Sequence, residues 1–103
     1  MIKRRISELL KSGCPGECVE VKGWVRTKRE AKVFSFLELN DGSSLKSLQV
    51  VAEESLPGFA LNVSRAGTGA ALRVKGELVE SPGKEQRVEL RAEEVELVGT
   101  CPQ

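Results

Sequence analysis

Side chains that could bind an unpaired nucleic-acid base are concentrated in residues 23–51, GWVRTKREAKVFSFLELNDGSSLKSLQVV. Phe36 offers an aromatic ring, Gln49 an amide and Glu38 a carboxylate. Rings of this kind stack on bases, and amides and carboxylates bond to base edges. The same stretch carries four cations that suit phosphate groups: Arg26, Lys28, Arg29 and Lys32. These residues predict an RNA-binding face.

Period-two alternation assigns these side chains to faces of two strands, because neighbouring strand residues point to opposite sides of a sheet. The aliphatic sides must turn to a core, and the other sides remain for a ligand. The expected inner residues of the first of these strands are Val33, Ser35, Leu37 and Leu39, and its outer residues are Phe34, Phe36 and Glu38. On the next strand Leu48 and Val50 should point inward, and Ser47, Gln49 and Val51 outward.

The elements that position this face follow from the rest of the pattern. Residues 2–11 have helical spacing of apolar side chains and should pack over one end of the domain. Strands are predicted at 19–27, 71–79 and 87–98, with a basic loop after the first of them. Gly23 and Gly76 lie inside strands, which indicates bends or bulges. A tight turn is expected at 40–43, a turn at 81–85, and a short helix or turn at 59–65.

Five strands, with a short N-terminal helix and a short helical segment between the third and fourth strands, indicate an all-β OB-fold, a Greek-key barrel. This fold binds ligands on the face of its second and third strands and at the loops after strands one and four. The predicted base-binding face falls at that position. Trp24 should face away from the core valines and cover the edge of the barrel.

Composition limits the alternatives. A chain of 103 residues suffices for one domain, which we expect to span residues 1–103. The 16 basic and 15 acidic residues give a net charge of +1, so only the distribution of charge can favour nucleic acid. Basic residues outnumber acidic ones in residues 1–52 and are outnumbered in 53–103. With no long apolar run and no leader pattern, we expect a cytoplasmic protein without a membrane span.

Neither a metal site nor a catalytic site is indicated. The three cysteines Cys14, Cys18 and Cys101, with no histidine, supply too few ligands for zinc, so we expect free thiols in a reducing compartment. No cofactor is expected. With neither histidine nor tyrosine, no pattern of nucleophile and base is present, and the chain alone should not be an enzyme.

The phrases GWVRTKRE, FSFLELNDGS and LQVV resemble the N-terminal anticodon-binding domain of class IIb aminoacyl-tRNA synthetases. The resemblance covers nearly the whole chain. The leader ISELLKSG, the run Leu39–Ser43 and the turn SPGKEQ favour the bacterial asparaginyl type over the aspartyl type. The resemblance implies that the chain binds tRNA through the asparagine anticodon. It also implies that aminoacylation, the ligase reaction of protein biosynthesis, occurs on a separate class II catalytic domain that this sequence lacks.

The resemblance also implies roles for individual residues. Phe36 would stack on the central uridine of the anticodon, and Gln49 and Arg29 would bond to the same base. Arg26, Lys28 and Lys32 would contact phosphate. Glu38 would either accept a bond from a base or hold Arg29 in place. Loop 80–86 would lie near the outer anticodon nucleotides.

Several alternatives remain open at this point. Phe36 could pack under the N-terminal helix, and Phe34 could either pack at the barrel edge or contact RNA. The domain could be a single-strand nucleic-acid binder without sequence preference, or a scaffold that docks a partner. We expect the isolated domain to be a monomer.

Overall fold

The computed structural model describes residues 2–3 (backbone only), 5–31, 33–43, 45–56, 63, 66–81 and 88–99. In chain order the elements are β1 (Ile2–Lys3), α1 (Ile6–Ser12), β2 (Cys18–Glu30), β3 (Phe34–Asn40), β4 (Leu48–Glu53), β5 (Ala71–Glu80) and β6 (Val88–Gly99). The predicted helix or turn at 59–65 lies outside the described residues apart from Val63. The predicted turn at 81–85 lies outside them apart from Ser81.

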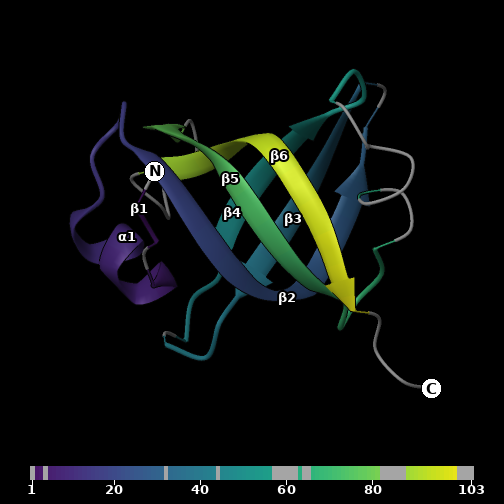
Figure 1. Cartoon of the computed structure of the whole chain (residues 1–103), viewed down its shortest axis with the longest axis horizontal. Helices are drawn as coiled ribbons and strands as arrows, with labels where there is room; N and C mark the ends of the chain where they lie inside the picture. The colour runs from purple at the N-terminus through teal and green to yellow at the C-terminus, as the bar shows by residue number, and fades with distance from the viewer. Residues whose placement is uncertain are drawn as a thin grey trace.

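Five strands close into a barrel (Figure 1). The order β2–β3–β4–β6–β5 returns to β2, because the first half of β2 pairs with β5 and its second half pairs with β3. β4 and β6 run parallel, and the other barrel pairs are antiparallel. Because the long strand β2 pairs with both β5 and β3, the barrel closes and lacks the exposed edges that an open sheet would present. The predicted OB-fold is confirmed.

The core lies inside this barrel and follows the predicted alternation. Its largest completely buried side chains come from α1 and all five barrel strands: Ile6, Leu9, Val19, Val21, Val25, Leu37, Leu39, Leu48, Val50, Leu72, Leu78 and Leu90. Phe34, Phe36 and Glu38 point outward between the buried residues of β3, as predicted. Val33 and Ser47 were assigned to the wrong sides. Val33 precedes β3 and is exposed, and Ser47 precedes β4 and is buried against Asn40.

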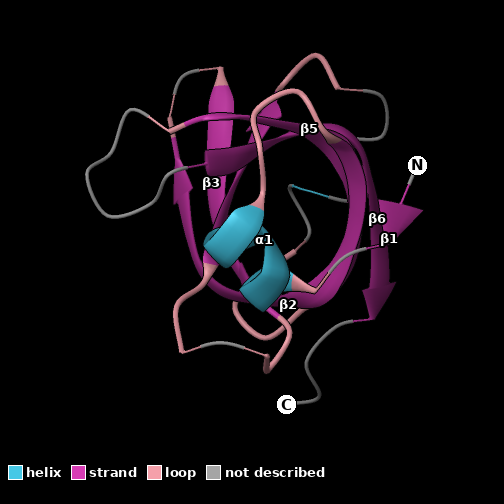
Figure 2. Cartoon of the chain, turned by 90° about the vertical axis from the view of Figure 1, so that its left-hand side faces the viewer, coloured by secondary structure: helices cyan, strands magenta, loops and turns pink. Residues whose placement is uncertain are grey.

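The N-terminal helix is shorter than the sequence predicts. Ile2 and Lys3 pair in parallel with Val19 and Glu20 of β2, so they form a strand instead of the first helical turn. α1 begins at Ile6 and lies across one opening of the barrel (Figure 2). Ile6 and Leu9 are completely buried there. The helix therefore packs over one end of the domain, as predicted, although its start was misplaced by four residues.

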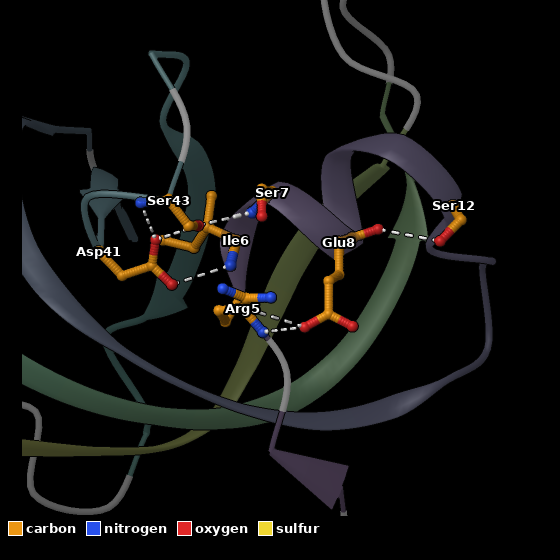
Figure 3. Close-up of polar contacts among 7 residues, drawn as sticks. All are labelled: Arg5, Ile6, Ser7, Glu8, Ser12, Asp41 and Ser43. Atoms are coloured by element: carbon orange, nitrogen blue, oxygen red, sulfur yellow. Dashed lines mark hydrogen bonds and ion pairs between the residues drawn. The ribbon is translucent and has the colours of Figure 1, made fainter.

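The start of α1 is fixed by side chains from the connection between β3 and β4 (Figure 3). Asp41 Oδ2 accepts a hydrogen bond from the amide of Ile6 at 3.0 Å, and Ser43 Oγ accepts one from the amide of Ser7 at 3.0 Å. The first amides of a helix have no partner within the helix, so these bonds satisfy groups that would otherwise be unpaired. The tight turn predicted at 40–43 is instead the beginning of a longer connection, because β4 starts only at Leu48.

Irregularities at two glycines shape the barrel. A Cβ on Gly23 would lie 2.5 Å from the carbonyl oxygen of Asn40, and one on Gly76 would lie 2.1 Å from that of Arg91. Both strands therefore approach a neighbouring backbone more closely than a side chain permits. The β5–β6 register shifts between Lys75 and Gly76, and the β2–β3 register shifts just after Gly23, between Val25 and Thr27. The predicted irregularities are present, and in β2 the extra residue is Arg26.

Across the described part of the chain, no helix is long and apolar enough to cross a membrane.

Candidate nucleic-acid interface

Three adjacent strands bring the outward aromatic and polar residues together. In the β2–β3–β4 register, Arg29 lies opposite Phe36, and Phe36 lies opposite Val51. The next row joins Thr27, Glu38 and Gln49. Side chains directly opposite one another in a sheet are close enough to interact. We refer to the outward side chains of these two rows as the outer face.

The outer face contains a hollow of about 190 Å³ lined by Thr27, Lys28, Arg29, Phe36, Glu38 and Gln49. Phe36 is half-buried and is not part of the hydrophobic core. Its ring therefore forms part of the wall of the hollow. This arrangement does not favour the alternative in which Phe36 packs beneath the N-terminal helix.

Arg29 contacts the ring of Phe36. Its guanidinium carbon lies 4.9 Å from the ring centroid, within the range of a cation–π interaction. Arg29 is exposed, and such a contact at an exposed site contributes about 0.5–1 kcal/mol. The contact holds five N–H donors beside the aromatic surface. Two residues that the resemblance assigns to the same base are thus in contact with each other.

Gln49 is held by a residue that the sequence pattern did not single out. Its Nε2 donates a hydrogen bond to Glu89 Oε2 at 2.7 Å, and Glu89 is buried although it is charged. An ionised carboxylate only accepts hydrogen bonds, so this contact sets which end of the amide is the donor. Glu89 lies forty residues further along the chain, and only the pairing of β4 with β6 brings it beside Gln49. No local signal in the sequence indicates this contact.

Lys28 lies elsewhere than the predicted basic loop. β2 continues to Glu30, so Arg26, Lys28 and Arg29 belong to a strand, and Lys32 lies outside the described residues. Lys28 Nζ donates to the carbonyl oxygens of Val63 at 2.7 Å and Ala66 at 3.0 Å. It also pairs with Glu30 at 3.3 Å. These contacts favour a role in holding the segment before β5 and give no support to a phosphate contact. Arg26 is exposed at the bulge.

The remaining candidates are placed as follows. Glu38 is exposed on the outer face opposite Gln49. Of loop 80–86, only Glu80 and Ser81 are among the described residues.

Trp24 is exposed, as predicted, and lies on the β2–β5–β6 side of the barrel in a hollow of about 380 Å³. Cys14 and Cys18 are exposed free thiols. In the described residues, no cluster of three or more acidic or cysteine side chains could hold a metal ion.

A closed five-stranded barrel with an aromatic ring, an amide and a guanidinium on this face is typical of nucleic-acid-binding OB-folds. Residues 19–98 match the tRNA anticodon family, whose members are described as an OB-fold nucleic acid binding domain. The chain belongs to this family.

Relatives of known function agree with this assignment. The chain is 56% identical over 99 residues to the asparagine–tRNA ligase of Nostoc sp., covering 96% of this chain and 21% of that ligase. It is 46% identical over 101 residues to the asparagine–tRNA ligase of Nitratidesulfovibrio vulgaris, covering 98% of this chain and 22% of that ligase. The chain thus spans about a fifth of the length of the curated relatives it matches.

A solved structure shows the same fold. The asparaginyl-tRNA synthetase of Entamoeba histolytica, in complex with asparaginyl-adenylate, matches 99% of this chain and 24% of its own chain. The TM-score is 0.79 at 24% sequence identity. An identity this low supports the fold alone.

Proposed function

We propose that this chain reads the anticodon of an asparagine tRNA and does not itself catalyse aminoacylation. The observation that carries the proposal is the placement of Phe36, Arg29 and Gln49 around one hollow on the OB-fold ligand face. The similarity to asparagine–tRNA ligases supports asparagine as the amino acid. The ligase reaction belongs to a separate class II catalytic domain, as the resemblance to class IIb synthetases implies. The matching ligases are about five times as long as this chain.

The central uridine stacks on Phe36. Stacking a base on an aromatic side chain contributes about 1–3 kcal/mol, whereas the exposed Arg29–Phe36 contact contributes about 0.5–1 kcal/mol. A base that replaces Arg29 on the ring therefore contributes more free energy by stacking than is lost with the Arg29–Phe36 contact. Arg29 then bonds to the base or to an adjacent phosphate with its fixed set of donors.

Gln49 selects uridine over cytidine. The N3 atom of uracil carries a proton and that of cytosine does not, so an acceptor at this point favours uracil. Because Nε2 donates to Glu89, the carbonyl oxygen of the same amide is the Gln49 atom that accepts from this proton. Glu38, in the same row, lies within the hollow and adds a second acceptor for base N–H groups.

Two substitutions test these roles in the chain as given. Phe36→Ala should weaken binding of an anticodon stem-loop by about 1–3 kcal/mol without a comparable loss of folding stability. Gln49→Ala should reduce the preference for U over C at the central position more than it reduces overall affinity. A large fall in the free energy of unfolding for Phe36→Ala, or an equal loss for every central base with Gln49→Ala, would overturn the respective role.

A further inference from the structure

The hollow around Trp24 lies apart from the site proposed for the anticodon. It has a volume of about 380 Å³ and lies on β2, β5 and β6, whereas the hollow beside Phe36 lies on β2, β3 and β4. The described lining residues of the two hollows do not overlap. Anticodon reading therefore leaves the Trp24 hollow without an assigned role.

Apolar side chains are exposed at this hollow. Trp24 is 43% exposed and Val98 is 60% exposed, and both line it together with Ala71. The ring of Trp24 lies against the β3–β4 connection, because a Cβ added at Gly42 would lie 3.5 Å from its Cη2 atom. A large aromatic ring that packs on one side and is open to solvent on the other is typical of the central contact of a protein–protein interface.

Charged side chains complete the lining of the hollow. Arg73 Nη2 and Glu96 Oε2 form a salt bridge of 2.9 Å. Lys22 and Asp41 also line the hollow. Apolar side chains beside such polar groups are the usual composition of a surface that binds another folded domain.

The end of β6 determines which domain can reach this surface. Gly99, the last residue of β6, pairs with Ala71, and Ala71 pairs with Trp24, so three strands meet in one row at the hollow (Figure 1). Polypeptide that follows Gly99 therefore starts at the edge of the hollow. The chain covers 21% and 22% of two matched ligases, so most of a protein of that length lies outside this domain. A domain joined at this edge has a high effective concentration for contact with Trp24.

We propose that the Trp24 hollow is the docking surface for the catalytic domain of a longer ligase, with Trp24 and Val98 at the centre of the contact. An apolar side chain of that domain fills the hollow, and Arg73 and Glu96 contact its polar neighbours. The hollow beside Phe36 lies on a different face of the barrel, so both surfaces can be occupied at once. The inference rests on the proposed function only for the identity of the docked domain.

The test places this chain in a full-length ligase. In a chimera, the chain replaces the matching 99-residue segment of the Nostoc sp. ligase. Hydroxyl-radical footprinting with mass spectrometry measures the exposure of individual side chains in the chimera and in the isolated chain. The modification rates of Trp24 and Val98 should fall at least about threefold in the chimera, as expected when half-exposed side chains enter the buried core of an interface. Val33, which is 55% exposed at the β2–β3 hairpin, is the control and should keep its rate.

Variants separate docking from folding. In the chimera, Trp24→Ser should return the modification rate of Val98 to that of the isolated chain, whereas Val33→Ser should not. In the isolated chain, Trp24→Ser should change the affinity for a GUU stem-loop by less than about twofold, because the ring lies on another face. If Trp24→Ser destabilises the isolated chain, Val98→Lys places a charge in the contact from an exposed position and should return the rate of Trp24 instead.

Other outcomes overturn the inference. Equal rates for Trp24 and Val98 in the chimera and in the isolated chain would show that the hollow stays open to solvent. Protection of Trp24 in the isolated chain that increases with protein concentration would assign the surface to a second copy of this chain. Protection of Trp24 by an added GUU stem-loop would assign it to RNA. The preference for a central uridine is measured separately on the isolated chain, so a failure of this inference is distinguishable from a failure of the proposed function.

Discussion

The carboxylate of Asp41 accepts a hydrogen bond from the backbone amide of Ile6 at 3.0 Å, across 35 positions of sequence (Figure 3). This bond connects the helix that covers one barrel opening to the end of β3, the strand that carries Phe36. The same carboxylate also accepts bonds from the amide and hydroxyl of Ser43. The β3–β4 connection thus caps the helix from outside its own sequence.

Removal of this cap should destabilise the domain. Asp41→Ala is expected to lower the free energy of unfolding by about 0.5–2 kcal/mol, the usual contribution of a helix N-cap. Asp41→Asn keeps an oxygen acceptor and should lower it by less. Urea unfolding of the three proteins at neutral pH measures the difference. Equal stability of the alanine variant and the unchanged chain would show that the helix does not depend on the cap.

The Asp41 cap should also make stability depend on pH. Burial raises the pKa of Asp41, but hydrogen bonds from Ser43, the Ile6 amide and other backbone donors lower it more, so it lies below its usual 3.8. A lowered folded-state pKa contributes stability that is complete above the unfolded-state value and is lost as pH falls through the folded-state value. The stability advantage over Asp41→Asn should therefore be constant above about pH 5 and shrink below about pH 4. Urea unfolding of both proteins from pH 7 to pH 3 measures this, and a constant difference would contradict it.

Lys28 should support the fold. Lys28→Met keeps most of the aliphatic stem and removes the ammonium that binds the Val63 and Ala66 carbonyls. The free energy of unfolding should fall by about 1.5–3 kcal/mol, the range for hydrogen bonds to a charged group. Arg26→Met, at an exposed position of the same strand, is the matched control and should stay within about 0.5 kcal/mol. Similar values for both variants in urea unfolding would argue against the structural role.

Gly76 should be intolerant of any side chain. Gly76→Ala places a Cβ 2.1 Å from the carbonyl oxygen of Arg91, so β5 and β6 must separate. We expect the free energy of unfolding to fall by about 1–3 kcal/mol or more. Gly67→Ala is the control, because no atom lies within 4 Å of the added Cβ. A thermal or urea denaturation that ranks the two variants equally would show that the barrel relaxes around the bulge.

Glu89 should matter for base choice through Gln49. Glu89→Gln replaces the acceptor-only carboxylate by an amide that can both donate and accept, so the orientation of the Gln49 amide is no longer fixed. The preference for a central U over C should decrease, while Glu93→Gln, exposed on the same strand, should leave it unchanged. Fluorescence-anisotropy titrations with the two stem-loops measure the ratio. An unchanged ratio for Glu89→Gln would show that Glu89 does not position Gln49 for reading.

The barrel was predictable because its strands have a strong local pattern. Alternation placed Leu37 and Leu39 inside and Phe36 outside, and Gly76 marked a real irregularity. In β6 the alternation of buried residues resumes one position late, at Val95 after Ala92. The cause is an extra residue in β6, because Gly76 pairs with Ala92 and Lys75 pairs with Glu94.

Long-range contacts explain the features that were predicted wrongly or missed. The start of α1 depends on Asp41 and on the pairing of Ile2 with Val19, neither of which is local in sequence. In the sequence Lys28 is one of several basic residues, and only the fold brings the carbonyl groups of Val63 and Ala66 beside its ammonium. By alternation along its own strand, Glu89 should face solvent. It is buried because β4 lies beside β6.

The central claim, recognition of the middle anticodon base, is tested most directly by one titration. An asparagine anticodon stem-loop with GUU is compared with the same loop carrying GCU, at about 50 and 200 mM salt. We predict tighter binding to GUU, with a ratio between the two loops that persists at the higher salt, because base contacts are less sensitive to salt than phosphate contacts. Equal affinity for both loops, falling together as salt increases, would contradict this account and indicate a nucleic-acid-binding barrel without base preference.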